Sequence, residues 1–174
     1  MVRIISGKFK GHLLKTNQHP FLRPTSDRVK EALFSILGNI ENMRVIDLYA
    51  GCGNLGFEAI SRGAGACVMV EKNPQQIRLI KENTNRLGLR EKIEIVKADV
   101  LRFLDDPPQA DLVLADPPYR YRFFDRLLNL LTEKFKPATI ALEAGKDLTI
   151  PEHVNNTVVS HRLMGETSLT IMKV

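Results

Sequence analysis

The pattern of hydrophobic and polar positions separates a short N-terminal part from a longer, regularly alternating part. Residues 3–14 are typical of two short strands around a glycine-containing turn. From residue 26 to 37, apolar residues recur at i, i+3, i+4, i+7 and i+8, which predicts an amphipathic helix that ends at Gly38. We expect this helix to pack one face against the rest of the domain.

From Arg44 onward, short β-rich runs alternate with helical stretches. The predicted helices lie near residues 55–62, 74–87, 100–104 and 123–131, and the third is barely longer than a turn. Strands that are joined by crossover helices form a mostly parallel sheet covered on both faces. The predicted strands of this sheet are residues 44–48, 67–71, 93–97, 112–115 and 139–143.

The tail of the chain breaks this alternation. Residues 157–164 and 168–174 are two strand-like runs joined by only Gly165, Glu166 and Thr167. A link this short does not cross over a sheet, so the last two strands are predicted to be antiparallel. The whole pattern predicts one Rossmann-like α/β domain with a seven-stranded, mostly parallel sheet, in which 1–43 form a basic hairpin and helix and 44–174 form the core.

Charge and composition narrow the class of protein. The 174 residues carry a net charge of +5, of which residues 1–30 contribute +6 and the remainder −1. A positive N-terminal segment is expected of a nucleic-acid binder, although a solvated basic end explains the composition equally well. No run is apolar enough to span a bilayer and no signal peptide is evident, so we expect a cytoplasmic, monomeric protein. Cys52 and Cys67 are expected to be free thiols, and no metal site is expected.

A glycine-rich loop follows the first predicted strand of the core. Its pattern is G-x-G-x-x-G, from Gly51 to Gly56, and it leads from a strand into a helix. Such a loop lets the backbone approach a ligand at the carboxyl end of a strand, where open α/β sheets bind ligands. On its own it fits a dinucleotide or S-adenosylmethionine.

Three acidic residues favour S-adenosylmethionine. Asp47 precedes the glycines, where we expect its carboxylate to face the cationic end of the cofactor; near a pyrophosphate it would be repelled. Glu71 ends the next strand and is expected to accept hydrogen bonds from ribose hydroxyls, while Asp99 follows the third strand and is expected to accept one from the adenine amine. Each acid alone would more often be an ordinary strand-end residue or helix cap.

The motif Asp116-Pro117-Pro118-Tyr119 follows an apolar strand and indicates the chemistry. An exocyclic base amine is a poor nucleophile because its lone pair is delocalised into the ring. Hydrogen bonds from its N–H groups to the Asp116 carboxylate and to a backbone carbonyl near Pro117 would aim that lone pair at a methyl donor, while Tyr119 would stack on the base. The motif therefore predicts direct, in-line methyl transfer to a base that has been taken out of its stack.

These residues resemble the RsmD-type family of bacterial 16S ribosomal RNA guanine-N2 methyltransferases. The most specific part of the resemblance is the stretch from Leu22 to Phe34, beside residues 3–14, the glycine loop and the proline motif. It implies methylation of a guanine amine in ribosomal RNA, within a small-subunit assembly particle, with S-adenosylmethionine as the cofactor. It also implies cofactor contacts from Asp47, Tyr49, Ala50, Gly51, Gly53, Gly56, Glu71, Lys72, Asn73, Asp99 and Val100, catalysis by Asp116, Pro117, Pro118 and Tyr119, and substrate contacts from Arg3, Lys8, Lys10, Arg23, Thr25, Asp27, Arg28, Arg120 and Arg122.

Three other functions remain open from the sequence. A DNA adenine-N6 methyltransferase uses a closely similar motif, but the short N-terminal arm leaves little chain for reading DNA sequence. An NAD-dependent oxidoreductase shares the glycine pattern but does not explain Asp47. A catalytically silent RNA-binding module fits the charge but gives the proline motif no purpose.

Overall fold

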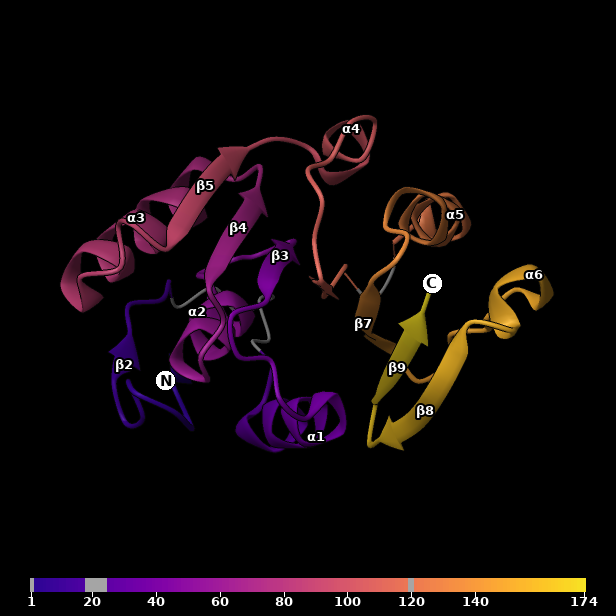
Figure 1. Cartoon of the computed structure of the whole chain (residues 1–174), viewed down its shortest axis with the longest axis horizontal. Coiled ribbons are helices and arrows are strands. Elements are labelled where there is room, and N and C mark those ends of the chain that lie inside the picture. The colour runs from indigo at the N-terminus through magenta and orange to yellow at the C-terminus, as the bar shows by residue number, and fades with distance from the viewer. Residues whose placement is uncertain (1, 18–24, 119–120) are drawn as a thin grey trace.

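The computed structural model describes residues 2–17, 25–118 and 121–174. In this part of the chain, a seven-stranded sheet lies between two layers of helices (Figure 1). Strands β3 to β7 are parallel and the last two strands, β8 and β9, are antiparallel to each other, as predicted; β9 also pairs antiparallel with β7. The sheet order is β5-β4-β3-β6-β7-β9-β8, with strands β3 (Arg44–Leu48), β4 (Ala66–Glu71), β5 (Ile93–Lys97), β6 (Leu112–Ala115), β7 (Thr139–Gly145), β8 (Val158–Met164) and β9 (Thr167–Lys173).

The helices cover the two faces of this sheet separately. Side chains of α1, α2 and α3 share one buried cluster with the N-terminal residues, whereas those of α4, α5 and α6 share the other. Capping sets the first helix: Ser26 accepts a hydrogen bond from the Val29 amide at its start, and Gly38 with φ 71° ends it. The helices are α1 (Asp27–Leu37), α2 (Asn54–Ser61), α3 (Pro74–Leu87), α4 (Val100–Phe103), α5 (Phe124–Lys134) and α6 (Glu152–Asn155).

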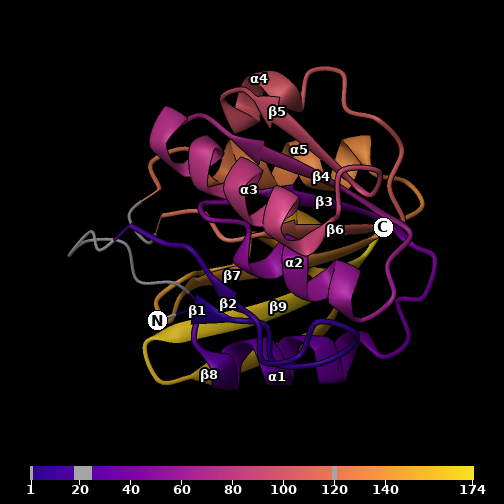
Figure 2. The same cartoon turned by 90° about the vertical axis from the view of Figure 1, so that its left-hand side faces the viewer.

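The N-terminal strands are shorter than the sequence predicts. Strand β1 (Val2–Arg3) pairs antiparallel with β2 (Leu13–Leu14), and this pair lies beside α2 and α3 (Figure 2). The residues between these strands form turns that bond to α2: the Ile5 amide donates to the Glu58 carboxylate at 2.8 Å and the Lys8 amide to the Ser61 carbonyl at 2.8 Å. The segment is therefore held against a helix and not extended as a free hairpin.

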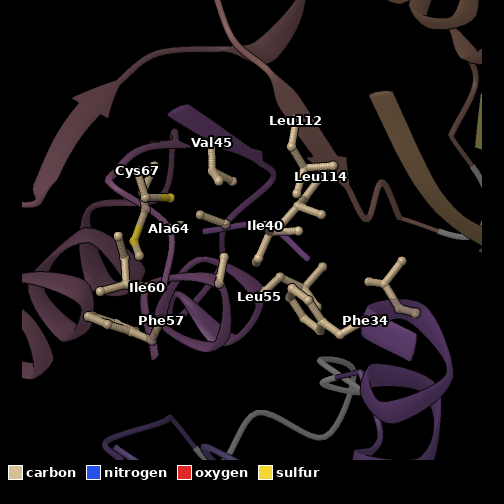
Figure 3. Packing of buried hydrophobic residues seen from close by; sticks show 14 of the residues in the cluster. Phe34, Ile40, Val45, Leu55, Phe57, Ile60, Ala64, Cys67, Leu112 and Leu114 are labelled. Carbon is tan, nitrogen blue, oxygen red and sulfur yellow. The ribbon is translucent and has the colours of Figure 1, made fainter. Parts of the chain in front are cut away.

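The core on the α1 face positions the glycine loop. Leu55, Phe57 and Ile60 of α2 belong to the same buried cluster as Val45 and Leu114 of the sheet (Figure 3). These side chains are at most 4% exposed, and their burial removes apolar surface from water. Helix α2 is thus fixed on the sheet, and the loop that precedes it is fixed with it.

Two elements extend at least two residues beyond their predicted ends, and one further helix was not predicted. Strand β7 continues two residues beyond the predicted end because Gly145 pairs with Thr167 of β9. Helix α5 continues to Lys134 through polar residues, and the short helix α6 was not predicted. No helix in the described ranges combines the length and the apolar character needed to cross a bilayer.

Candidate active site at the carboxyl edge of the sheet

The glycine loop turns sharply between β3 and α2. Gly51 has φ 55° and Gly53 has φ 85°, and Gly53 is the N-cap of α2. Tyr49 also has a positive φ of 60°, which is unusual for a residue with a side chain and typical of functional loops. A Cβ at Gly56 would lie 2.5 Å from the Met69 methyl carbon and 3.0 Å from Asp47 Oδ2, so the Met69 side chain would have to shift. At Gly51 and Gly53 the positive φ itself favours glycine.

The structure corrects the expected orientation of Asp47. Its carboxylate is 2% exposed and accepts a hydrogen bond from the Gly56 amide at 2.9 Å, so it faces the first turn of α2. Burial raises the pKa of Asp47 to about 8, and the nearby Asp116 and Glu71 add to this effect. Asp47 therefore holds the start of α2 by accepting from the Gly56 amide. In this orientation its carboxylate does not face the ligand side of the loop, so repulsion of a pyrophosphate by Asp47 is not an argument against a dinucleotide.

Glu71 links the end of β4 to the glycine loop. One of its carboxylate oxygens accepts from the Gly51 amide at 2.9 Å, and the other accepts from the Asn73 amide at 2.8 Å. Asn73 in turn caps α3 by accepting from the Gln75 amide. The predicted acid and the predicted loop are thus joined directly, and Ala50, which precedes Gly51 in the loop, is buried.

Asp99 lies at the next strand end and has two partners. It caps α4 by accepting from the Leu101 amide at 3.1 Å, and its other oxygen lies 3.3 Å from the Lys72 amine. Its side chain is 42% exposed, so it is open to a ligand. Val100, the first residue of α4, is buried. The structure therefore brings the predicted cofactor residues of β4 and β5 to one edge of the sheet.

Asp116 follows β6 and lies next to Thr25. The Thr25 hydroxyl donates to the Asp116 carboxylate at 3.2 Å. Burial raises the pKa of Asp116 to about 6, while the Thr25 hydrogen bond opposes the shift. Pro117 is buried and Pro118 is exposed. Tyr119 lies outside the described residues, as do two predicted substrate residues, Arg23 and Arg120.

A cavity of about 380 Å³ lies beside the two prolines, on the β7 side of β6. Tyr121 and Phe124 contribute aromatic rings to its wall. Tyr121 also meets Tyr49 of the glycine loop edge-to-face, with ring centroids 5.4 Å apart. The wall also contains the charged residues Lys146, Asp147 and Glu166, and its aromatic side packs on the α5 face of the sheet. A hollow of this size with aromatic walls fits an unstacked base. The motif after β6 thus stands between this cavity and the glycine loop.

Sequence reasoning missed a buried lysine that joins the N-terminal segment to α2. The Lys30 side chain is 1% exposed, and its amine donates to the Arg3 carbonyl at 2.5 Å and to the Asn54 side chain at 2.9 Å. Asn54 also donates to the Thr25 carbonyl at 3.1 Å. Burial lowers the pKa of Lys30, and the carboxylate of Glu58, 3.8 Å away, opposes this. The helical periodicity alone placed Lys30 on α1 without showing that it is buried.

The described residues among the predicted RNA contacts lie on several elements. Lys8 and Lys10 are exposed beside Ser61, which ends α2, whereas the glycine loop is at the beginning of that helix. Arg3 is paired with Asp27 at 2.8 Å. The remaining two described candidates, Arg28 and Arg122, are exposed on α1 and before α5.

Comparisons with known proteins agree with this geometry. A family model described as "Conserved hypothetical protein 95" matches residues 2–173. The chain is 32% identical to the "Putative rRNA methyltransferase YlbH" of Bacillus subtilis over 99% of this chain and 98% of that protein. It is 35% identical to the "Ribosomal RNA small subunit methyltransferase D" of Haemophilus influenzae, with 94% and 89% covered.

Solved structures show the same fold. The putative methyltransferase yhhF from Escherichia coli superposes with a TM-score of 0.85 at 28% identity, over 99% of this chain and 97% of that one. The hypothetical protein TTHA0928 of Thermus thermophilus superposes with a TM-score of 0.84 at 32% identity, over the whole of both chains. This chain therefore belongs to the family described as "Conserved hypothetical protein 95", the RsmD-type methyltransferase family.

Proposed function

We propose that this chain transfers a methyl group from S-adenosylmethionine to the exocyclic N2 amine of a guanine in small-subunit ribosomal RNA. Methylation of ribosomal RNA is the activity named for its relatives in Bacillus and Haemophilus. The guanine and its N2 amine are the finer part of the proposal, supported by the resemblance of residues 22–34 and by the Asp116 motif. We further propose that the chain acts as one cytoplasmic, monomeric domain on RNA inside an assembly particle.

The observation that carries the proposal is the place of Asp116 in the sheet. Strand β6 pairs with β3, which leads into the glycine loop, and with β7, whose end borders the cavity. Asp116 follows β6, so its backbone lies between the strand that leads into the glycine loop and the strand whose end borders the hollow, while its side chain faces Thr25. Direct methyl transfer requires this order, because the amine and the methyl donor must meet in line.

The residues at the ends of β4 and β5 suit S-adenosylmethionine. Each oxygen of Glu71 accepts one backbone hydrogen bond and keeps a further lone pair, which a ribose hydroxyl can use. Asp99 is open at its carboxylate and adjoins the same edge. The bound cofactor would supply a sulfonium methyl group, and the protein would supply position and orientation.

Asp116 prepares the amine for attack. With a pKa of about 6 it is mostly ionised at neutral pH, so its carboxylate accepts an N–H of the amine. A backbone oxygen near Pro117 would accept the second N–H. Both bonds concentrate the lone pair on nitrogen and direct it away from the ring. As the nitrogen takes the methyl group it gives up one proton, for which the hydrogen-bonded Asp116 carboxylate is the proposed acceptor.

The test uses undermethylated small-subunit particles and labelled S-adenosylmethionine. We expect Asp116→Ala to abolish methyl transfer and to keep the cofactor dissociation constant within about threefold, because Asp116 binds the amine and not the cofactor. Asp105→Ala, which removes an exposed carboxylate from a loop, is the matched control and keeps full activity. Mass mapping then identifies the methylated nucleotide. Wild-type turnover by Asp116→Ala, or a methylated base other than guanine, refutes the proposal.

A further inference from the structure

Glu143 is a buried carboxyl group that the proposed function has not used. It lies in β7, is 4% exposed, and its Oε2 atom has no hydrogen-bond partner among the described residues. Burying a polar group without a partner is costly, and buried polar groups are normally paired. Burial, with the nearby Asp116, raises the pKa of Glu143 to about 8. The Oε2 atom of Glu143 is thus a buried acceptor that lacks a hydrogen-bond donor within the described part of the chain.

The sheet places Glu143 next to Asp116. Ala115 of β6 pairs with Leu142 of β7, so Asp116 and Glu143 occupy the following positions on these two neighbouring strands. Two residues earlier on the same strands, Leu114 and Ala141 lie in one buried cluster on the α1 face. Because side chains alternate along a strand, Asp116 and Glu143 belong to that same face.

Thr25 supplies one donor to this pair of carboxyl groups. Its hydroxyl proton is given to Asp116 at 3.2 Å, and it is near enough to Glu143 to lower the pKa of that group. The Thr25 backbone is held in place by Asn54. In the described part of the chain, no three His, Cys, Asp or Glu side chains form a group that could hold a metal ion. One hydroxyl does not satisfy two carboxyl groups, so an acceptor is left over.

The Watson–Crick edge of guanine has donors that match this surplus of acceptors. It presents the two N–H bonds of the N2 amine and, directly beside them, the N–H of ring nitrogen N1. Asp116 and a backbone oxygen near Pro117 take the two amine bonds in the proposed function. Glu143, the third acceptor, lies beside Asp116 and can therefore pair with the N1–H of guanine. Enzymes that extrude a base read it through its Watson–Crick edge.

We propose that Glu143 accepts the N1–H hydrogen bond of the target guanine and so selects guanine over bases whose N1 has no hydrogen. The inference rests on the proposed function and names the residue that reads the base. In the empty site the raised pKa keeps Glu143 mostly protonated at neutral pH, and a hydrogen bond from guanine N1–H favours its ionised form. Adenine carries a lone pair at N1, which the ionised carboxylate repels. A site built to accept a hydrogen bond rejects an analogue that lacks the donor, because its own buried group stays unpaired.

The test compares guanine with 2-aminopurine at the mapped position of ligated ribosomal RNA, assembled into small-subunit particles. 2-Aminopurine keeps the 2-amine but has a bare N1. We expect wild type to prefer guanine by at least about tenfold in kcat/KM, in line with the discrimination that one specific base contact gives. Glu143→Gln, whose amide can donate to a bare N1, and Glu143→Met, which offers no comparable acceptor, are each expected to reduce that ratio to within about threefold.

Controls separate recognition from folding. Glu133→Gln removes an exposed carboxylate at the end of α5, and it keeps the wild-type ratio. Thermal unfolding and S-adenosylmethionine binding of both Glu143 variants stay close to wild type. A wild-type ratio near one, or an unchanged ratio in both Glu143 variants, overturns the inference and leaves guanine methylation standing. If wild type does not methylate the guanine-containing particles, the proposed function falls and the inference falls with it.

Discussion

Replacing Gly7 by alanine tests how firmly the N-terminal segment is held on α2. Gly7 has φ +77°, and a Cβ at this position would lie 1.8 Å from the Ser61 carbonyl oxygen. Real Cβ atoms essentially never approach another atom closer than 3.0 Å, so the segment has to move away from the helix. The Ser61 carbonyl belongs to the backbone of α2 and is not free to rotate aside.

The magnitude follows from the bonds that this movement breaks. The Lys8 amide donates to the Ser61 carbonyl at 2.8 Å, the Phe9 amide donates to the Ser61 hydroxyl at 2.9 Å, and that hydroxyl donates to the Ser6 carbonyl at 2.5 Å. Each bond contributes about 1 kcal/mol net, and the positive φ costs alanine about 1 kcal/mol more. Gly7→Ala should therefore lose about 4 kcal/mol, which lowers Tm by about 8–16 °C in a domain of this size.

Gly11→Ala is the matched control. Gly11 also has a positive φ, +88°, but a Cβ there meets nothing within 4 Å. It should lose only about 1 kcal/mol, or about 2–4 °C in Tm. Thermal unfolding by far-ultraviolet circular dichroism gives both values. If the segment detaches before the core unfolds, hydrogen exchange reports it as lost protection at the Lys8 and Phe9 amides. Equal Tm losses with full protection at those amides in both variants would refute the reasoning.

Two further predictions concern buried charge. Lys30→Met removes the amine that bonds the Arg3 carbonyl and Asn54 and leaves these two oxygens without that donor, while Glu58 keeps its ion pair with Arg62. Because hydrogen bonds from a charged donor contribute about 1.5–3 kcal/mol each, the variant should lose about 3–5 kcal/mol in urea unfolding. A loss below about 1 kcal/mol contradicts a role of Lys30 in holding the N-terminal segment on α2. The rate at limiting substrate, kcat/KM, should fall as pH drops through about 6, because Asp116 must be ionised to accept the amine and its pKa is raised to about 6. Initial rates between about pH 5 and 8 check this, and a flat acid limb contradicts it.

The sequence predicted the sheet well because its central strands β3, β6 and β7 are buried on both faces and the parallel strands are separated by helices. Residues 112–115 are an unbroken apolar run, and the structure buries all of them in β6. The prediction of Glu71 and Asp99 at neighbouring strand ends succeeded for the same reason: parallel strands that are joined by crossover helices end at one edge.

What the sequence did not predict depends on contacts between distant residues. Asp47 was assigned to the cofactor because it precedes the glycines, yet its side chain bonds the Gly56 amide under α2. Lys30 and Glu143 carry charges that a local pattern places at the surface, and only the packing of α1 and the pairing of β6 with β7 bury them. Such side chains become visible as site residues only once their neighbours are known.

Helix α2 couples the glycine loop, which precedes it, to the basic N-terminal segment, which is bonded to its last turn. It begins at the glycine loop, and its last turn carries Glu58 and Ser61, which anchor the basic segment. A helix of eight residues spans only about 12 Å, so it has no spare turn to absorb a change at either end. The N-terminal segment is consequently difficult to replace by another sequence while α2 stays unchanged. A protein engineer who wished to replace the N-terminal segment would have to rebuild α2 together with it.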